Sequence, residues 1–196
     1  AYLVLEHVRG RTLGETLRER GGPLPEAEAL DVAGRVGEAL ATIHAAGLLH
    51  RDVSPANLIV TGSGRIVLID FGLARDYDPD RTSAMTRIVT PGYGLAAPLY
   101  RLLPATTPPA AHDRQAGEEV PAPRTVVPDV SRLVSDAVLD GLELDPAHRP
   151  QTVDAFLARL GIGSTEPVTA PPPAAPTRAQ YVVPVAPAVP PAPRGG

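Results

Sequence analysis

Residues 50–72 read HRDVSPANLIVTGSGRIVLIDFG and contain two short motifs in a fixed order. The first motif fits the pattern H-R-D-x-x-x-x-N and ends at Asn57, and the second is D-F-G and begins at Asp70. Between them lie two apolar, β-prone runs that are separated by a turn rich in glycine. We therefore expect a β-hairpin over Leu58–Ile69 that brings Asn57 close to Asp70.

The residue types of these motifs suit the chemistry of phosphoryl transfer. A carboxylate at Asp52 can orient a substrate hydroxyl and accept its proton. Asn57 and Asp70 offer the hard oxygen ligands that Mg²⁺ requires when it neutralises nucleotide phosphates. The alternative, in which Asp52 and Asp70 only cap turns, does not account for two motifs in this order.

The two motifs also carry a family resemblance. From Tyr2 to about Leu160 the chain resembles the large lobe of a protein kinase, most of all that of the bacterial serine/threonine kinases related to the eukaryotic ones. The resemblance implies an α+β, protein kinase-like fold, with a mainly α-helical C-terminal lobe that carries a small β-hairpin and with the small lobe absent. It implies ATP-dependent phosphoryl transfer to hydroxyl groups of a protein substrate, with ATP and Mg²⁺ as cofactors.

The same resemblance implies roles for single residues of the catalytic loop. Arg51 and Ser54 act there beside Asp52 and Asn57, while Asn57 and Asp70 hold the Mg²⁺ and the nucleotide. Ser54 stands where serine/threonine kinases have a lysine, and the whole chain contains no lysine. Some bacterial kinases with a His-Arg-Asp-x-Ser-Pro loop show the same replacement.

The start of the chain resembles the end of a kinase small lobe. Residues 2–5 are apolar and β-prone, and Glu6-His7-Val8 follows them. The resemblance implies a hinge whose backbone groups near Glu6 and Val8 face the adenine ring, although these residues alone fit an ordinary strand end equally well. In the family the glycine-rich loop, the ATP-anchoring lysine and its glutamate precede the hinge, so they would lie ahead of residue 1. We therefore expect a truncated kinase whose activity as this chain alone is impaired.

Two helices are predicted between the hinge and the catalytic loop. Thr12 and Glu15 form a capping box for a helix that ends near Gly21. Pro25 fits the first position of a longer helix, in which two glycines at 34 and 37 indicate close packing. The apolar positions that should face the core of this longer helix are Leu30, Ala33, Val36, Leu40 and Ile43.

Residues 73–93 resemble an activation loop, because they are polar and show little helical or strand periodicity. A phosphate on Thr82, Ser83 or Thr86 could pair with Arg51, since the guanidinium group of arginine binds phosphate through two hydrogen bonds. The alternative for each hydroxyl is simple solvation in a loop. The candidates for phosphorylation are Thr82, Ser83, Thr86 and Thr90.

After this loop the sequence departs from the family pattern. The Ala-Pro-Glu-like segment, the docking region and most of a long buried helix are missing, which we interpret as an internal deletion near residues 93–95. Because proline breaks a helix interior but fits a helix start, we expect a short helix that begins at Pro98. The segment 104–128 is rich in proline and alanine and is predicted to be loop.

Two further helices are predicted in the last part of the lobe. Asp129 fits the cap of the first, and Thr152 and Gly161 fit the start and stop of the second. Between them, Arg149 matches the kinase arginine that pairs with the glutamate of Ala-Pro-Glu, which is missing here. The apolar stripe of the first helix consists of Val130, Leu133, Val134, Ala137, Val138 and Leu142.

The chain therefore divides into a partial kinase large lobe, residues 1–161, and a Pro/Ala-rich tail, residues 162–196, that we expect to be a disordered linker. A net charge of −4 without a basic run argues against nucleic acid as a partner. No apolar run approaches the roughly 20 residues that span a bilayer, and the histidines lack metal-ligand spacing. The absence of cysteine is compatible with a reducing cytoplasm, and the oligomeric state stays open.

Three functions of different classes remain open at this stage. The chain is part of an active serine/threonine kinase, or a non-catalytic pseudokinase that acts as a regulatory binding module, or a gene remnant. The presence of Asp52, Asn57 and Asp70 together favours kinase ancestry.

Overall fold

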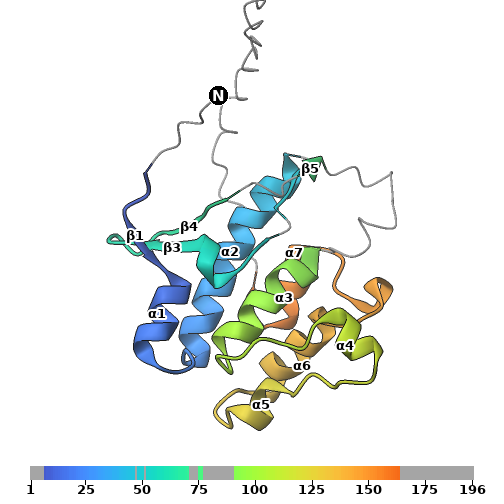
Figure 1. Cartoon of the computed structure of the whole chain (residues 1–196). Coiled ribbons are helices and arrows are strands. Elements are labelled where there is room, and N and C mark those ends of the chain that lie inside the picture. The colour runs from blue at the N-terminus through green and yellow to red at the C-terminus, as the bar shows by residue number, and fades with distance from the viewer. Residues whose placement is uncertain (1–6, 47, 51, 71–74, 77–90, 164–196) are drawn as a thin grey trace, which may run out of the picture. The chain divides into compact units, whose positions relative to one another are not determined.

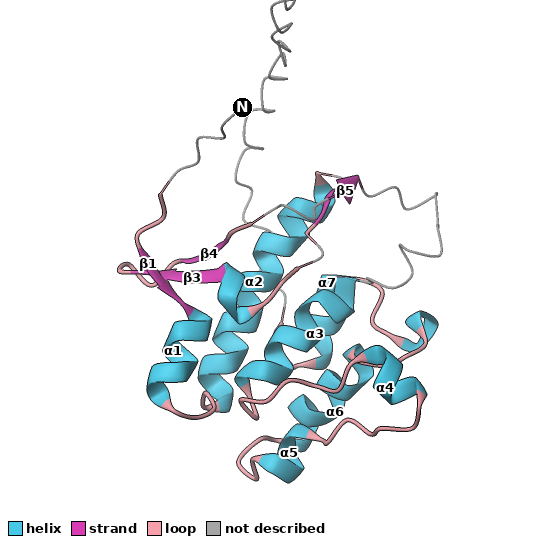
Figure 2. Cartoon of the chain, in the orientation of Figure 1, coloured by secondary structure: helices cyan, strands magenta, loops and turns pink. Residues whose placement is uncertain are grey.

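The computed structural model describes most of the first 163 residues. They form helices and a small antiparallel sheet (Figures 1 and 2). Backbone contacts divide the chain into Ala1–Ser164 and Thr165–Gly196, and the second unit lies outside the described residues, as does the predicted disordered tail from residue 164 onward. The fold class predicted from the sequence is confirmed. The described residues are 7–46, 48–50, 52–70, 75–76 and 91–163.

The predicted hairpin is present and forms the centre of a three-stranded sheet. Strand β3 (Leu58–Thr61) pairs antiparallel with β4 (Ile66–Leu68), with Leu58 opposite Leu68. Both of these leucines are buried, so the hairpin is anchored in the core at the end that leads to the two motifs. The register therefore places the residue before β3 beside the residue after β4.

A third strand, β1 (Gly10–Thr12), pairs antiparallel with β3 and was not predicted. A Cβ added at Gly10 would lie 2.4 Å from the carbonyl oxygen of Val60, so only glycine permits this close approach of the two backbones. Two short strands, β2 (Leu48–Leu49) and β5 (Arg75–Asp76), form a separate antiparallel pair.

Helix α1 (Leu13–Arg20) begins and ends where the sequence predicts. The side chain of Thr12 accepts a hydrogen bond from the Glu15 amide, and the Glu15 side chain accepts one from the Thr12 amide. Gly21 ends the helix with a φ of 68°, a left-handed conformation that glycine adopts at little cost.

Helix α2 (Glu26–Ala45) is the longest helix among the described residues, and it contacts the sheet as well as α3 and α7 (Figure 1). The prediction of close packing is confirmed at Gly37, where a Cβ would lie 2.8 Å from Leu157 Cδ1. At Gly34 the nearest atom belongs to Ile162 at 3.9 Å, so crowding does not account for that glycine.

Helix α3 (Pro91–Leu102) corrects the prediction of a helix that begins at Pro98, because Pro98 lies inside it. An interior proline costs about 3 kcal/mol. The turn around it buries three leucines almost completely, and each buried leucine contributes about 1.5–3 kcal/mol. Burial in the core therefore exceeds the cost of the proline. These leucines are Leu95, Leu99 and Leu102.

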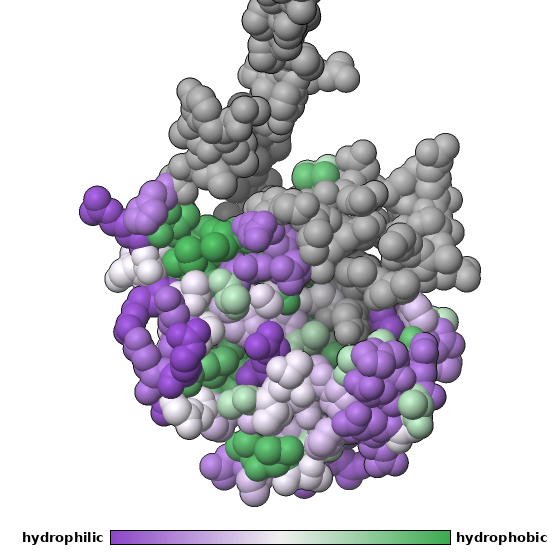
Figure 3. Space-filling model, in the orientation of Figure 1, coloured by the Kyte–Doolittle hydropathy of each residue, from purple (hydrophilic) through white to green (hydrophobic). Residues whose placement is uncertain are grey.

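The segment after α3 contains two short helices rather than loop alone. They are α4 (Ala111–Gln115) and α5 (Pro123–Val126), and the hydroxyl of Tyr100 donates a hydrogen bond of 2.9 Å to the carbonyl oxygen of Pro121 between them. Val126 is 44% exposed, and an apolar patch covers α5 in the surface view of Figure 3.

Helix α6 (Arg132–Gly141) starts three residues later than the predicted cap. Ser131, not Asp129, accepts a hydrogen bond from the amide of Val134. With this start Leu133 points outward and is 58% exposed, so the predicted apolar stripe is wrong at that one position.

The last helix, α7 (Val153–Arg159), is capped by the side chain of Thr152 and is followed by Gly161 with a φ of 75°. It packs with α3 and α6 around one apolar cluster, in which Phe156 is fully buried. Among the helices in the described part of the chain, none is both long and apolar enough to cross a membrane.

Candidate active site

The loop that carries the first motif is held to the core by its own apolar residues. Pro55 is buried and begins a 3₁₀ turn over Pro55–Asn57, and Val53 packs against the core. The amide of Asn57 donates a hydrogen bond of 2.9 Å to the carbonyl oxygen of Ser54 and closes the turn. This turn folds the loop back, so that Asn57 faces Asp52, five residues earlier in the same motif.

Within the loop, Asn57 is bound directly to Asp52. The Nδ2 atom of Asn57 donates one hydrogen bond to the backbone oxygen of Asp52 and another to its carboxylate Oδ2, each of 2.9 Å. Asp52 is exposed and Asn57 is half-buried. The arrangement fixes one carboxylate oxygen and leaves Oδ1 facing solvent with no protein donor among the described residues.

The second motif reaches the loop through the hairpin. The amide of Ile69 donates a hydrogen bond of 2.9 Å to the carbonyl oxygen of Asn57. Nε2 of His50, a buried side chain, lies 3.1 Å from the carbonyl oxygen of Ile69 and therefore donates to it. Ile69 is thus held from both sides, and the exposed Asp70 follows it.

Asp70 has a φ of 64°, which is uncommon for a residue with a side chain. Backbone strain of this kind costs of order 1–3 kcal/mol and is concentrated at functional sites. The conformation turns the chain directly after Ile69, the residue that is hydrogen-bonded to Asn57. Of the predicted site residues, the structure therefore brings Asp52 and Asn57 into contact and places the start of the D-F-G motif next to them.

The oxygen atoms of this group fit a divalent cation. Because both hydrogen bonds to Asp52 use the Nδ2 atom of Asn57, the amide oxygen of Asn57 is the atom left to accept a cation. Asp70 adds an exposed carboxylate. Carboxylate and amide oxygens are the protein ligands that Mg²⁺ prefers.

The remaining predicted site residues fall into two groups. Val8 and Ser54 are described, both half-buried, and Ser54 has an extended backbone with no capping hydrogen bond from its side chain. The others lie outside the described residues and stay predictions. They are Glu6, Arg51, Thr82, Ser83, Thr86 and Thr90.

Two residues with structural roles, one at the site and one in the turn between α6 and α7, were not singled out as such from the sequence. His50 belongs to the first motif, and its contact with Ile69 shows that it ties the loop to the hairpin. Arg149 is buried, and its guanidinium donates hydrogen bonds to the carbonyl oxygens of Glu143 and Leu144. It therefore helps to hold the turn between α6 and α7.

Comparison with known proteins gives consistent matches. The protein kinase domain family matches residues 1–98, half of the chain. The probable serine/threonine-protein kinase PknB of Corynebacterium glutamicum is 33% identical over 192 residues, which cover 82% of this chain and 29% of that protein. The serine/threonine-protein kinase PknA of Mycobacterium tuberculosis is 46% identical over 78 residues, or 40% of this chain and 18% of that protein.

A solved structure supports the same relationship. The crystal structure of the Mycobacterium tuberculosis PknI kinase domain matches with a TM-score of 0.64 and 27% identity, over 80% of this chain and 63% of that chain. The chain spans less than a third of the length of the curated relatives named above. The match of the protein kinase domain family to half of the chain, which includes the contact between Asp52 and Asn57, shows that the chain belongs to the protein kinase family.

Proposed function

We propose that this chain is the large lobe of a serine/threonine protein kinase, which transfers a phosphoryl group from ATP to a hydroxyl of a protein substrate. The observation that supports this most is the hydrogen bond between Asn57 Nδ2 and Asp52 Oδ2, because it orients both functional groups of the loop at once. The relatives that match over most of this chain are named as serine/threonine kinases.

In the proposed reaction Asp52 positions the acceptor. Its Oδ1 accepts the hydrogen bond of a serine or threonine hydroxyl and then its proton, while Oδ2 stays bound to Asn57. The amide oxygen of Asn57 and the carboxylate of Asp70 hold Mg²⁺, which neutralises phosphate charge when it is bound. Asn57 thus links the acceptor side and the phosphate side of the site.

The proposal places the nucleotide next to Val8 and Glu6 and assigns Arg51 to the loop beside Asp52. Phosphorylation of Thr82, Ser83 or Thr86 would regulate the site through Arg51, and Thr90 is a further candidate for phosphorylation. We place the protein in the cytoplasm, where ATP is available. These assignments rest on the family resemblance and the tests below.

Catalysis of phosphoryl transfer consists mainly of positioning and charge neutralisation. The 196 residues contain no lysine, and Ser54 is neutral where the family has a cation. We therefore propose that the chain alone transfers phosphate at no measurable rate and that a small lobe restores the activity.

The test compares the chain with a fusion in which the small lobe of the Corynebacterium glutamicum kinase precedes residue 7. Both are incubated with Mg-ATP and a generic protein substrate, beside Asp52→Asn versions of each. We expect phosphorylation by the fusion only, and none by its Asp52→Asn version.

A fusion that folds and binds ATP but transfers no phosphate would contradict the proposal and favour the pseudokinase alternative. Metal binding is tested separately with Mn²⁺, whose paramagnetism should broaden the NMR signals of residues 57 and 70 in the chain. Asn57→Ala should reduce that broadening.

A further inference from the structure

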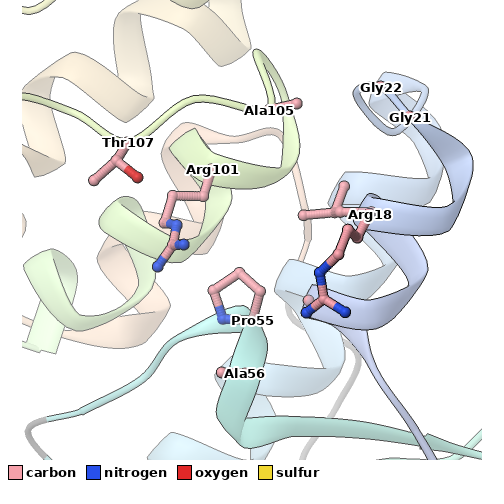
Figure 4. Close-up of a pocket in the computed structure, with 10 residues that line it drawn as sticks. Arg18, Gly21, Gly22, Pro55, Ala56, Arg101, Ala105 and Thr107 are labelled. Atoms are coloured by element: carbon pink, nitrogen blue, oxygen red, sulfur yellow. The ribbon is translucent and has the colours of Figure 1, made fainter.

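A cavity lies beside the catalytic loop, on the side away from the hairpin. It has a volume of about 470 Å³, opens to solvent, and is lined by α1, the 3₁₀ turn of the loop and the end of α3 with the residues that follow it (Figure 4). This size is within the range of pockets that bind small ligands, which is about 300–1,000 Å³. The lining residues are Gly14, Leu17, Arg18, Gly21, Gly22, Pro55, Ala56, Arg101, Ala105 and Thr107.

Two arginines give this cavity its charge. Arg18 of α1 and Arg101 of α3 extend from opposite walls toward Pro55, and Thr107 contributes a hydroxyl on the Arg101 side (Figure 4). None of the ten lining residues is acidic. Hydrophilic residues also gather over α1 in Figure 3.

Within the described part of the chain, neither Arg18 nor Arg101 donates a hydrogen bond or forms an ion pair, and both are exposed. The charge of Arg18 also acts on the carboxylate of Glu15, which is not one of the lining residues. Arg18 and Arg101 both line this cavity, where a bound anion would lower the electrostatic energy of both. Five other arginines of the described residues have a carboxylate partner. Those paired in this way are Arg11, Arg20, Arg35, Arg132 and Arg159.

The cavity is within reach of a substrate that is bound at Asp52. Pro55 in the cavity wall lies three positions after Asp52, which corresponds to about 10 Å at most. An extended peptide advances about 3.3 Å per residue. A side chain about two to four residues from the acceptor hydroxyl therefore reaches the two arginines.

We infer that this cavity binds an acidic side chain of the protein substrate, either a carboxylate or a phosphorylated residue, about two to four residues from the acceptor. The inference rests on the proposed function for the role of the peptide, but the binding itself requires neither ATP nor catalysis. The chain carries a net charge of −4, so attraction to an acidic peptide comes from this local pair of cations and not from the molecule as a whole.

The test measures binding of fluorescent serine peptides to the full chain by anisotropy, at low and at physiological salt. Four peptides share one sequence except at the positions two to four residues on either side of the serine. At these positions one peptide carries glutamate, the second phosphoserine, the third alanine and the fourth lysine. We expect the glutamate and phosphoserine peptides to bind about tenfold more tightly than the alanine peptide, with a smaller difference at higher salt.

Matched variants locate the effect. The double change Arg18→Gln and Arg101→Gln should remove the preference, whereas Arg65→Gln with Arg124→Gln removes the same charge from exposed residues elsewhere and should keep it. The change Arg18→Glu with Arg101→Glu should reverse the preference toward the lysine peptide. Circular dichroism melts confirm that each variant is folded.

The results separate the possible ligands and the two proposals. Tighter binding of phosphoserine than of glutamate identifies a phosphorylated residue as the ligand, and equal binding identifies a carboxylate. The inference is overturned if glutamate and alanine peptides bind equally, or if the glutamine pair keeps the preference. If the fusion phosphorylates all four peptides equally, the inference about the cavity is overturned while the proposed kinase function stands. If the acidic peptides bind more tightly but the fusion phosphorylates none of the peptides, the kinase function is overturned while the inference about the cavity stands.

Discussion

Gly141 of α6 lies directly against Ala96 of α3, and there is no room for a side chain between them. A Cβ added at Gly141 would come within 2.5 Å of Ala96 Cβ and within 2.8 Å of Phe156 Cε2. Ala96 and Phe156 are completely buried. Three helices that are distant in the sequence, α3, α6 and α7, therefore meet at this glycine.

We predict that Gly141→Ala destabilises the fold by about 1–3 kcal/mol, because the methyl group forces α3 and α6 apart. Urea unfolding followed by circular dichroism measures the change. The control is Gly94→Ala in α3, where an added Cβ meets nothing within 4 Å, and which should stabilise the helix by up to about 1 kcal/mol. Equal effects of the two changes would show that the α3–α6 contact is not as close as described.

Asn57→Ala should lower the activity of the small-lobe fusion by about 100-fold or more, because it frees the carboxylate of Asp52 and also removes the proposed metal ligand. Phosphate transfer to a generic substrate measures the effect. Ser63→Ala in the exposed hairpin turn is the control and should leave the rate unchanged. If Asn57→Ala keeps the full rate, Asn57 does not link the acceptor side and the phosphate side of the site as proposed.

Thr12→Ala should cost about 1 kcal/mol of folding stability, because it removes the side-chain cap of α1. Hydrogen bonds from the backbone and side chain of Thr12 hold the pKa of Glu15 below its ordinary value. The stabilisation from Glu15 is therefore present at neutral pH and is lost as the pH falls through and below 4.5. Thr16→Ala in the same helix is the control, and it should have no destabilising effect.

Burial lowers the pKa of His44 in α2 below its ordinary value of 6.5. The unfolded chain then binds a proton at a higher pH than the folded chain, so this residue reduces stability as the pH falls through about 6.5. His44→Gln should flatten that part of the stability curve. Chemical unfolding at pH 5.5 and at pH 7.5 gives the change in unfolding free energy with pH for His44→Gln and for the control His7→Gln. If this change is the same in both variants, the prediction is contradicted.

The parts of the fold that the sequence predicts correctly depend on neighbours along the chain. The capping box of Thr12, the left-handed Gly21 and the hairpin that brings Asn57 to Ile69 all follow from local spacing. Pro98 was misjudged because Leu95, Leu99 and Leu102 of the same helix are buried against distant parts of the chain, and their burial outweighs the local cost of the proline.

Features that depend on distant residues could not be predicted in this way. Strand β1 contains Gly10, and its pairing becomes apparent only when the carbonyl of Val60 lies opposite. Arg18 and Arg101 meet at one cavity although 83 positions separate their residue numbers, and no local pattern links them. The cap of α6 is Ser131 and not the predicted Asp129, and the sequence could not distinguish them because both residue types suit an N-cap.

Strand β1 also makes the catalytic hairpin sensitive to force. The hydrogen bonds of an antiparallel pair run perpendicular to the strands, so a pull along β1 loads them together instead of breaking them one by one. At its other end β1 continues into α1 through Leu13, which is anchored in the core. A pull on a segment joined ahead of residue 7 therefore acts on β3 and on Asn57, which directly precedes this strand, so the sheet links the beginning of the chain mechanically to the loop of Asp52 and Asn57.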